Sequence, residues 1–174
     1  MHCAIIHYHE LALKGRNRDF FEQRLVRNIR LALKDLKIRR IESLQGRIRV
    51  TIPEDVAPAL VTERLRRICG VSNFLLSESV PLALHEPDLS IIKRVALRQL
   101  AEQTCTSFRV TAKRADKRLP LTSMDVEREV GAYLHETTGK AVKLKQPDLT
   151  LYIELLTKEA HVAARKIQGP GGMP

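Results

Sequence analysis

A concentration of basic side chains lies at the end of a predicted strand near the middle of the chain. The stretch 108–118 reads Phe-Arg-Val-Thr-Ala-Lys-Arg-Ala-Asp-Lys-Arg, with five cations and one acid, Asp116. Phe108, Val110 and Ala112 alternate with polar residues, and this period of two predicts a strand with one buried face. Cations on a loop that a strand supports are suited to binding phosphate. A solvated loop after an edge strand has the same composition, so this stretch alone leaves both interpretations open.

Other residue patterns exclude several kinds of chemistry. The sequence contains no Gly-x-x-x-x-Gly-Lys-Ser/Thr loop and no Gly-x-Gly-x-x-Gly loop, the two glycine patterns that hold nucleotide phosphates. His7 and His9 could supply two metal ligands, but a zinc site needs three or four. Cys3, Cys69 and Cys105 are widely spaced and form no Cys-x-x-Cys pair. We therefore predict reduced thiols, no metal site and no catalytic residue in this chain.

The overall charge makes nucleic acid the first partner to consider. The 174 residues carry 30 Lys and Arg against 20 Asp and Glu, a net charge of +10. The isoelectric point is about 9.9, which is typical of nucleic-acid-binding domains. Aromatic residues make up 4% of the chain and Trp is absent, so contacts to phosphate are favoured over base stacking. No apolar run approaches the ~20 residues of a membrane span, and we predict a cytoplasmic protein without membrane contact.

The first half of the chain has the periodicity of a split βαβ unit. Its elements are predicted in the order strand, helix, strand, strand, helix, strand, at residues 3–8, 17–35, 37–44, 47–52, 55–70 and 71–76. Gln45-Gly46 predicts a hairpin turn, and Asp55 is a candidate cap of the second helix. This order is that of the ferredoxin-like arrangement, in which two helices cover one face of a sheet.

The second half predicts a further α/β unit around the basic stretch. A helix from Asp88 to about residue 104 precedes the strand at 108–112, and a helix from Thr122 to Gly139 follows the basic loop. Thr122 and Asp125 have the spacing of a capping box. Strands are predicted at 149–156 and 160–166, and the glycine- and proline-rich end at 169–174 predicts a linker. The fold class is therefore α+β.

Several long motifs in this chain resemble one known family, the tRNA 4-thiouridine sulfurtransferases, also called thiamine-biosynthesis sulfurtransferases. The resemblance covers nearly the whole chain. It rests on Glu10-Leu-Ala-Leu-Lys-Gly-Arg-Asn-Arg18, Lys113-Arg-Ala-Asp-Lys-Arg-Leu-Pro-Leu-Thr-Ser123, Arg128-Glu-Val-Gly-Ala-Tyr133, Pro147-Asp-Leu-Thr-Leu-Tyr-Ile-Glu154 and Lys166-Ile-Gln-Gly-Pro-Gly-Gly-Met-Pro174. Two positions depart from the family pattern: His9 stands where Gly is usual, and Gln168 where Pro is usual. The first departure could alter the turn at Glu10.

The resemblance implies a domain order and a function. It implies a ferredoxin-like domain at 1–80, a THUMP domain at 81–168 and a linker at 169–174 towards a catalytic PP-loop domain outside this sequence. ATP, Mg²⁺ and the catalytic cysteines would belong to that domain, so this chain would hold no cofactor. The THUMP domain would dock the acceptor end of tRNA for thiolation of uridine-8. A cysteine desulfurase would supply the sulfur to the parent enzyme.

The basic cluster and its place in the family motif together select the candidate site. Nine basic residues are predicted to contact RNA: Lys113, Arg114, Lys117, Arg118, Arg109, Lys14, Arg16, Arg18 and Lys166. Two alternatives stay open. The chain could be a standalone THUMP protein that recruits tRNA for a separate catalytic chain. It could also be a protein–protein scaffold, dimerising through strand edges or through the hairpin that begins at 149–156.

Overall fold

The chain forms two compact units. A computed structural model describes residues 1–9 and 17–174. The first unit comprises Met1–Leu76 together with Lys166–Pro174, and the second comprises Ser77–Arg165. The predicted boundaries, after residues 80 and 168, treat each domain as one continuous segment. In the structure the first unit is discontinuous, because the end of the chain returns to it.

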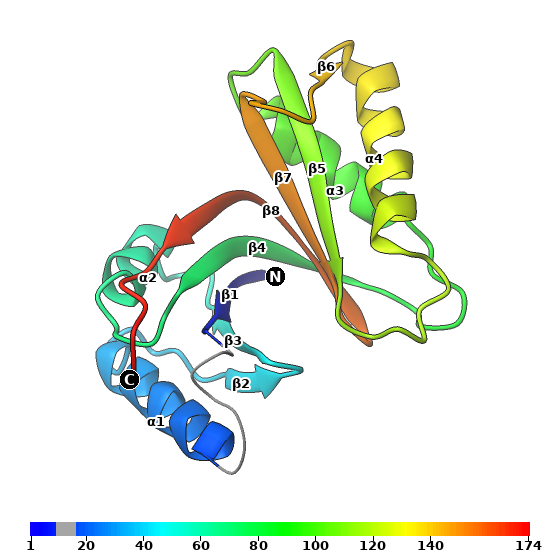
Figure 1. Cartoon of the computed structure of the whole chain (residues 1–174). Helices are drawn as coiled ribbons and strands as arrows, with labels where there is room; N and C mark the ends of the chain where they lie inside the picture. The colour runs from blue at the N-terminus through cyan, green and yellow to red at the C-terminus, as the bar shows by residue number, and fades with distance from the viewer. Residues whose placement is uncertain (10–16) are drawn as a thin grey trace. The chain divides into compact units, whose positions relative to one another are not determined.

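The first unit has the predicted ferredoxin-like topology (Figure 1). Its elements are β1 (His2–His7), α1 (Asn17–Ala32), β2 (Ile41–Leu44), β3 (Arg47–Ile52), α2 (Pro58–Leu65) and the start of β4 (Asn73–Pro81). The strands are ordered β2-β3-β1-β4, and β3 is antiparallel to both β1 and β2. Leu25 and Ile29 of α1 and Val61 and Leu65 of α2 are buried in one core with residues of the sheet. The α+β class and the order of the elements are thereby confirmed.

Local sequence explains the hairpin turn between β2 and β3 and the start of α2. Gln45 and Gly46 both have positive φ angles, of 48° and 80°, as a two-residue hairpin turn requires. The predicted start of the second helix at Asp55 is wrong. Helix α2 begins at Pro58, and Ala57 is its N-cap without a side-chain hydrogen bond. Proline suits the first helical position because its φ is already helical and its missing N–H would have had no partner there.

The second unit builds its own core around a mixed sheet. Its elements are the end of β4, α3 (Ser90–Ala101), β5 (Ser107–Arg114), α4 (Ser123–Thr138), β6 (Ala141–Val142), β7 (Leu149–Leu155) and most of β8 (Glu159–Gln168). The strand order is β8-β7-β5-β6, with β4 beside β8. Strand β5 is parallel to β6 and β7, whereas β7 is antiparallel to β8. Because β7 lies between β5 and β8, the hairpin considered for dimerisation is an interior part of the sheet. The short edge strand β6 was not predicted.

Helix α4 is fixed at both ends as its sequence predicts. The Thr122 hydroxyl accepts a hydrogen bond from the Asp125 N–H, and the Asp125 carboxylate accepts one from the Thr122 N–H, which confirms the capping box. Gly139 ends the helix with φ 71°, a left-handed conformation that costs glycine little. The capping box therefore fixes the position where the basic loop ends and α4 begins.

The final residues of the chain pair with the segment between α2 and β4. The N–H groups of Gly169 and Gly171 donate to the carbonyls of Ser72 and Val71, and the Gly70 N–H donates to the Gly171 carbonyl. A Cβ atom on Gly169 would lie 2.3 Å from the Val71 carbonyl oxygen, so only glycine permits this approach. The stretch predicted as a linker is in this structure a bound part of the first unit.

Replacing Gly169 with Ala is expected to destabilise the chain by about 1–3 kcal/mol, because the added methyl group overlaps the Val71 backbone. Gly131→Ala is the matched control: it lies within α4, and a Cβ atom there meets nothing within 4 Å. That substitution should stabilise by roughly 0.5–1 kcal/mol through helix propensity. Urea denaturation followed by circular dichroism measures both. Equal stabilities of the two variants would contradict the close packing of the tail.

Candidate nucleic-acid interface

Strand β5 separates a buried face from a polar face, as predicted. Phe108, Val110 and Ala112 are buried in the core of the second unit. Arg109 and Lys113 alternate with them, and Lys113 is exposed at the end of the strand. Figure 1 shows α4 running alongside β5. The core therefore fixes the direction in which Lys113 leaves the sheet.

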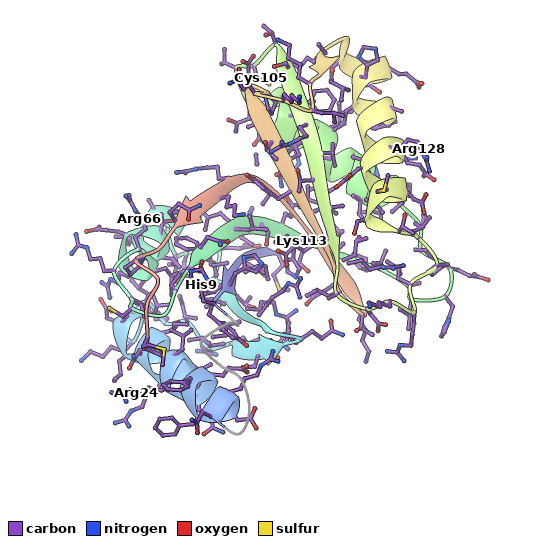
Figure 2. All side chains as sticks on the ribbon, in the orientation of Figure 1. His9, Arg24, Arg66, Cys105, Lys113 and Arg128 are labelled. Carbon is purple, nitrogen blue, oxygen red and sulfur yellow. The ribbon has the colours of Figure 1, made fainter. Side chains whose placement is uncertain are left out.

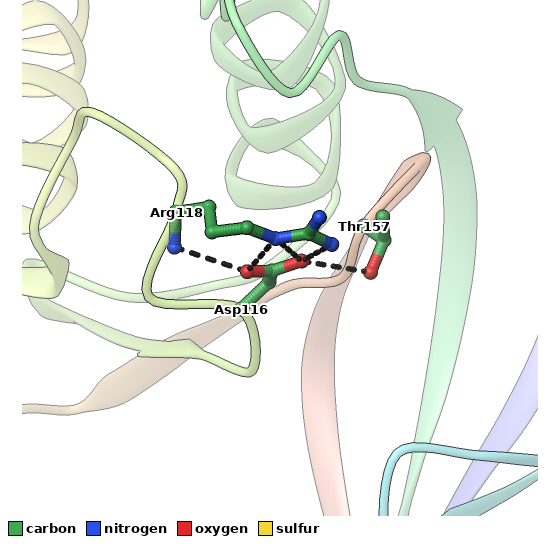
Figure 3. A network of polar contacts seen from close by, with 3 residues as sticks. All are labelled: Asp116, Arg118 and Thr157. Carbon is green, nitrogen blue, oxygen red and sulfur yellow. Dashed lines mark hydrogen bonds and ion pairs between the residues drawn. The ribbon is translucent and has the colours of Figure 1, made fainter.

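The loop after β5 is organised around the carboxylate of Asp116 (Figure 3). It accepts hydrogen bonds from the Arg118 N–H at 3.0 Å and from the Arg118 guanidinium, with Nη2 at 2.7 Å. The Thr157 hydroxyl, from the turn between β7 and β8, donates to the same carboxylate at 3.3 Å. Mainly because of the bonds from Arg118, the pKa of Asp116 lies well below its ordinary value of 3.8. Asp116 is thus an anion at all ordinary pH values, and it joins the basic loop to the β7–β8 turn.

Arg114 is also bound within the loop. Its Nη1 donates to the carbonyl oxygens of Leu119 at 3.0 Å and Leu121 at 3.3 Å. Leu119 is buried, with 2% of its surface exposed. The loop is therefore held both by burial of the Leu119 side chain and by hydrogen bonds to the carbonyls of Leu119 and Leu121. We interpret Arg114 as a residue that shapes the loop, since its guanidinium already has carbonyl acceptors.

The cations left open to a ligand are mostly lysines. Lys113 and Lys117 are exposed, and their side chains have no hydrogen bond or ion pair within the described part of the chain. Arg118 keeps 70% of its side chain exposed despite its pair with Asp116. Lys158 is exposed too, and it follows Thr157, which contacts Asp116. We name Lys113, Lys117, Arg118 and Lys158 the loop cations. Figure 2 labels Lys113 among them.

Lys158 is a candidate that the sequence analysis missed. It stands between Thr157 and Glu159 in what reads as a solvated hairpin turn, and no pattern relates it to a loop about forty residues earlier in the sequence. Tertiary contacts place its turn beside the basic loop: Thr157 donates to Asp116, and the Ala115 N–H donates to the Leu155 carbonyl.

Two other predicted contacts have different surroundings. Arg109 donates from Nη1 to the Leu144 carbonyl at 3.1 Å, and its Nη2 lies 3.5 Å from the Thr150 hydroxyl, so it secures the segment before β7. Lys166 is exposed on β8, but it belongs to the first unit. Neither belongs to the loop cations, and both remain predictions as RNA contacts.

The second predicted patch is only partly described. Lys14 and Arg16 lie outside the described residues. Arg18, on α1, is half-buried near the Tyr8 hydroxyl, which donates to Glu22. Burial and the Glu22 carboxylate raise the pKa of Tyr8 to about 12, although Arg18 acts in the opposite direction. Arg18 is thus engaged in the packing of α1 against the end of β1.

One buried group of side chains resembles a hydrolase triad in its residue types. The Ser77 hydroxyl lies 2.9 Å from Nδ1 of His161, and Nε2 of His161 lies 3.4 Å from the Glu159 carboxylate. Ser77 is 4% exposed and His161 is 0% exposed. No substrate can reach the hydroxyl in this arrangement, so we interpret the group as a buried polar contact between strands.

The histidines near the start of the chain are bound to side chains. His7 Nδ1 lies 2.8 Å from the Asn73 amide oxygen, and His9 Nε2 lies 3.4 Å from the Ser72 hydroxyl. Within residues 1–9 and 17–174, no three His, Cys, Asp or Glu side chains gather as a metal site would require.

Comparison with known proteins finds two successive family matches. Residues 3–74 match the ThiI ferredoxin-like domain, and residues 86–164 match the THUMP domain. The probable tRNA sulfurtransferase of Moorella thermoacetica is 37% identical over 171 residues, which cover 98% of this chain and 42% of that protein. The corresponding protein of Thermus thermophilus is also 37% identical, over 96% of this chain and 40% of its own length. The chain therefore spans less than half the length of these relatives.

Solved structures also match the whole of this chain over only part of their own length. The protein PH1313 from Pyrococcus horikoshii superposes with a TM-score of 0.89 at 31% identity, covering 100% of this chain and 57% of that one. A 4-thiouridine synthetase crystallised with RNA and bound ATP superposes with a TM-score of 0.77 at 26% identity, covering 100% of this chain and 43% of that one. Both superpositions include the first and the second unit.

The substitution Asp116→Asn is expected to lower stability at pH 7, because it removes the charge that Arg118 and Thr157 contact. A carboxyl group with a depressed pKa contributes stability above its unfolded pKa, and this contribution is lost as the pH falls. The unfolding free energy of the native chain should therefore fall below about pH 4, and that of the variant should fall less over the same range. Urea denaturation at pH 7, 4 and 3 measures the difference.

Glu54→Gln is the control for this experiment, since Glu54 is exposed and has no hydrogen bond or ion pair among the described residues. It should leave the pH profile unchanged. A profile of Asp116→Asn that parallels the native one would show that the Asp116 contacts do not hold the loop.

Proposed function

We propose that this chain, which carries the ferredoxin-like and THUMP domains of the tRNA sulfurtransferase family, binds tRNA and docks its acceptor region for thiolation. The observation that carries the proposal is the group of exposed loop cations on two segments that Asp116 joins through Arg118 and Thr157. One structural neighbour is a 4-thiouridine synthetase in complex with RNA, which supports RNA as the ligand.

The arrangement favours recognition of the RNA backbone over recognition of bases. A lysine is a mobile point charge that neutralises phosphate without demanding one geometry. Arg118 can add a directed hydrogen bond, because most of its side chain remains exposed. Contacts of this kind position an RNA and carry no base information directly. We therefore expect affinity for the shape and charge of the acceptor stem, with little dependence on its sequence.

The chemical step would take place on protein outside these 174 residues. We propose that a PP-loop domain, with ATP and Mg²⁺, activates uridine-8, and that a cysteine desulfurase supplies the sulfur. The sequence supports this division because it lacks a phosphate-binding loop and a Cys-x-x-Cys pair.

We also propose a cytoplasmic location. In the described residues no helix combines the length and apolarity needed to cross a bilayer. All three cysteines are free, and Cys69 is exposed. Exposed unpaired thiols persist where glutathione and thioredoxin keep them reduced.

The purified chain is expected to produce no 4-thiouridine in tRNA when ATP, Mg²⁺, cysteine and a desulfurase are supplied, because the phosphate-binding loop is absent from its sequence. The measurement is the near-ultraviolet absorbance of the recovered tRNA, with a full-length tRNA sulfurtransferase as positive control. Thiolation by the chain alone would contradict the proposed division of labour.

The triple substitution Lys113→Ala, Lys117→Ala and Lys158→Ala is expected to weaken tRNA binding and to flatten its salt dependence. Each lost phosphate contact should reduce the slope of log affinity against log salt by about 0.7–0.9, so the three together should reduce it by roughly 2–3 units. The fold should persist, because exposed lysines contribute little to stability. Fluorescence anisotropy with a labelled tRNA transcript at several salt concentrations measures both quantities.

The control variant carries Arg24→Ala, Arg27→Ala and Lys34→Ala, which remove the same charge from exposed positions of the first unit. It should retain the native slope within about half a unit. If the two variants lose affinity equally, the binding is a general effect of net charge and the loop cations are not the site.

A further inference from the structure

Helix α1 carries an apolar and basic stripe that the proposed RNA interface does not use. Its inner side buries Leu25 and Ile29. On its outer side Phe20 is 60% exposed and Leu31 is 58% exposed. They are two of the largest exposed apolar side chains in the described part of the first unit, and covering them with a partner would remove apolar surface from water.

The two apolar residues belong to a single shallow groove. It is lined by Phe20, Gln23, Arg24, Arg27, Asn28 and Leu31. The spacings of four, three and four from Phe20 through Arg24 and Arg27 to Leu31 place these residues on one face of the helix. With a rise of 1.5 Å per residue, the stripe extends about 16 Å, or three turns. This is the length over which a partner helix of similar size makes contact.

The charge of the groove has one sign. Arg24 and Arg27 are exposed and have no ion pair within the described residues, and Figure 2 shows Arg24 projecting outward from α1. Of the nearby acids, Glu22 accepts from Tyr8 and Asp35 is paired with Arg64. Asp19, in the first turn of α1, is exposed and precedes Phe20, but it is not among the residues that line the groove. Among the residues that the structure describes, no acid lines the groove. An approaching surface therefore meets the two positive charges of Arg24 and Arg27 between two apolar ends.

We propose that this outer face of α1 is a docking site for a protein segment, an acidic amphipathic helix whose apolar side chains cover Phe20 and Leu31. Carboxylates beside its apolar stripe would pair with Arg24 and Arg27. Helix-in-groove recognition uses apolar anchors at such spacings. Arginine and aromatic side chains are enriched where protein interfaces gain most of their energy.

Two other occupants fit the groove less well. An RNA backbone would satisfy the arginines, but it would gain nothing from Leu31, which cannot stack on a base. A second copy of this chain, packed through the same face, would bring Arg24 and Arg27 against their own copies, and like charges directly opposed are unfavourable. Since none of the residues predicted to contact RNA lines the groove, the inference does not rest on the proposed tRNA interface.

The test measures binding of designed peptides to the complete chain by fluorescence anisotropy. The probe is a fluorescein-labelled, 20-residue helical peptide with leucines at i, i+4, i+7 and i+11 flanked by glutamates. One comparison peptide replaces the glutamates with lysines, and another replaces the leucines with alanines. We expect the acidic amphipathic peptide to bind at least about tenfold more tightly than either comparison, because both kinds of contact are needed.

Variants of the chain locate the binding. Phe20→Ala with Leu31→Ala, and Arg24→Glu with Arg27→Glu, should each weaken the acidic peptide at least about tenfold. Arg39→Glu with Arg66→Glu is the matched control, since it makes the same charge change at exposed positions outside α1. Circular dichroism confirms the fold of each variant, which should persist because all the changed side chains are exposed.

Three results would overturn the proposal. The first is no preference for the acidic amphipathic peptide, or equal weakening by the control variant. The second is a loss of tRNA affinity in Arg24→Glu with Arg27→Glu as large as that in the loop-lysine variant, which would assign the groove to RNA. The third is a dimer in sedimentation velocity that Phe20→Ala with Leu31→Ala dissociates, which would assign the groove to a second copy.

Discussion

The carboxylate of Asp116 is the contact on which the candidate interface depends. Four cations occupy six consecutive positions of the chain, from Lys113 to Arg118, and without an anion among them they would repel one another. Asp116 is 9% exposed, so it acts from inside the loop and leaves the cations outside. Its bonds to Arg118 and Thr157 also tie the loop to a turn far away in the sequence. One acid therefore gives a highly charged loop a defined shape.

That defined shape separates side chains that look equivalent in the sequence. Arg114 and Lys113 are neighbours of the same charge, yet Arg114 is bound to carbonyls and Lys113 faces solvent. The alternation along β5 predicted the buried and polar faces correctly, because the period of a strand is a local property. Which cations already have a partner depends on loop geometry, and Lys158 enters the cluster only through a tertiary contact. Composition and spacing could locate the cluster, but they could not assign roles within it.

The same distinction explains the predictions of the fold. The ferredoxin-like order and the capping box at Thr122 follow from periodicity and short-range hydrogen bonds, and both are confirmed. The start of α2 was misplaced, because Asp55 is a possible cap but Pro58 sets the first helical φ. The segment from Gly169 was predicted as a linker because its residues favour no regular structure. Its place beside Val71 results from backbone pairing with a distant segment, which residue preferences do not indicate.

The return of the chain to the first unit makes the second unit an insertion. Strand β8 carries the backbone out of the second core, and residues from Lys166 onward complete the first. A ribosome releases residues in order, so the second unit can reach its native contacts while the first still lacks its last segment. Completing the first unit brings together residues that are about a hundred positions apart in the sequence. The entropy cost of closing this long loop is far smaller once the intervening residues are folded. We expect that folding of the second unit during synthesis brings the two segments of the first unit together.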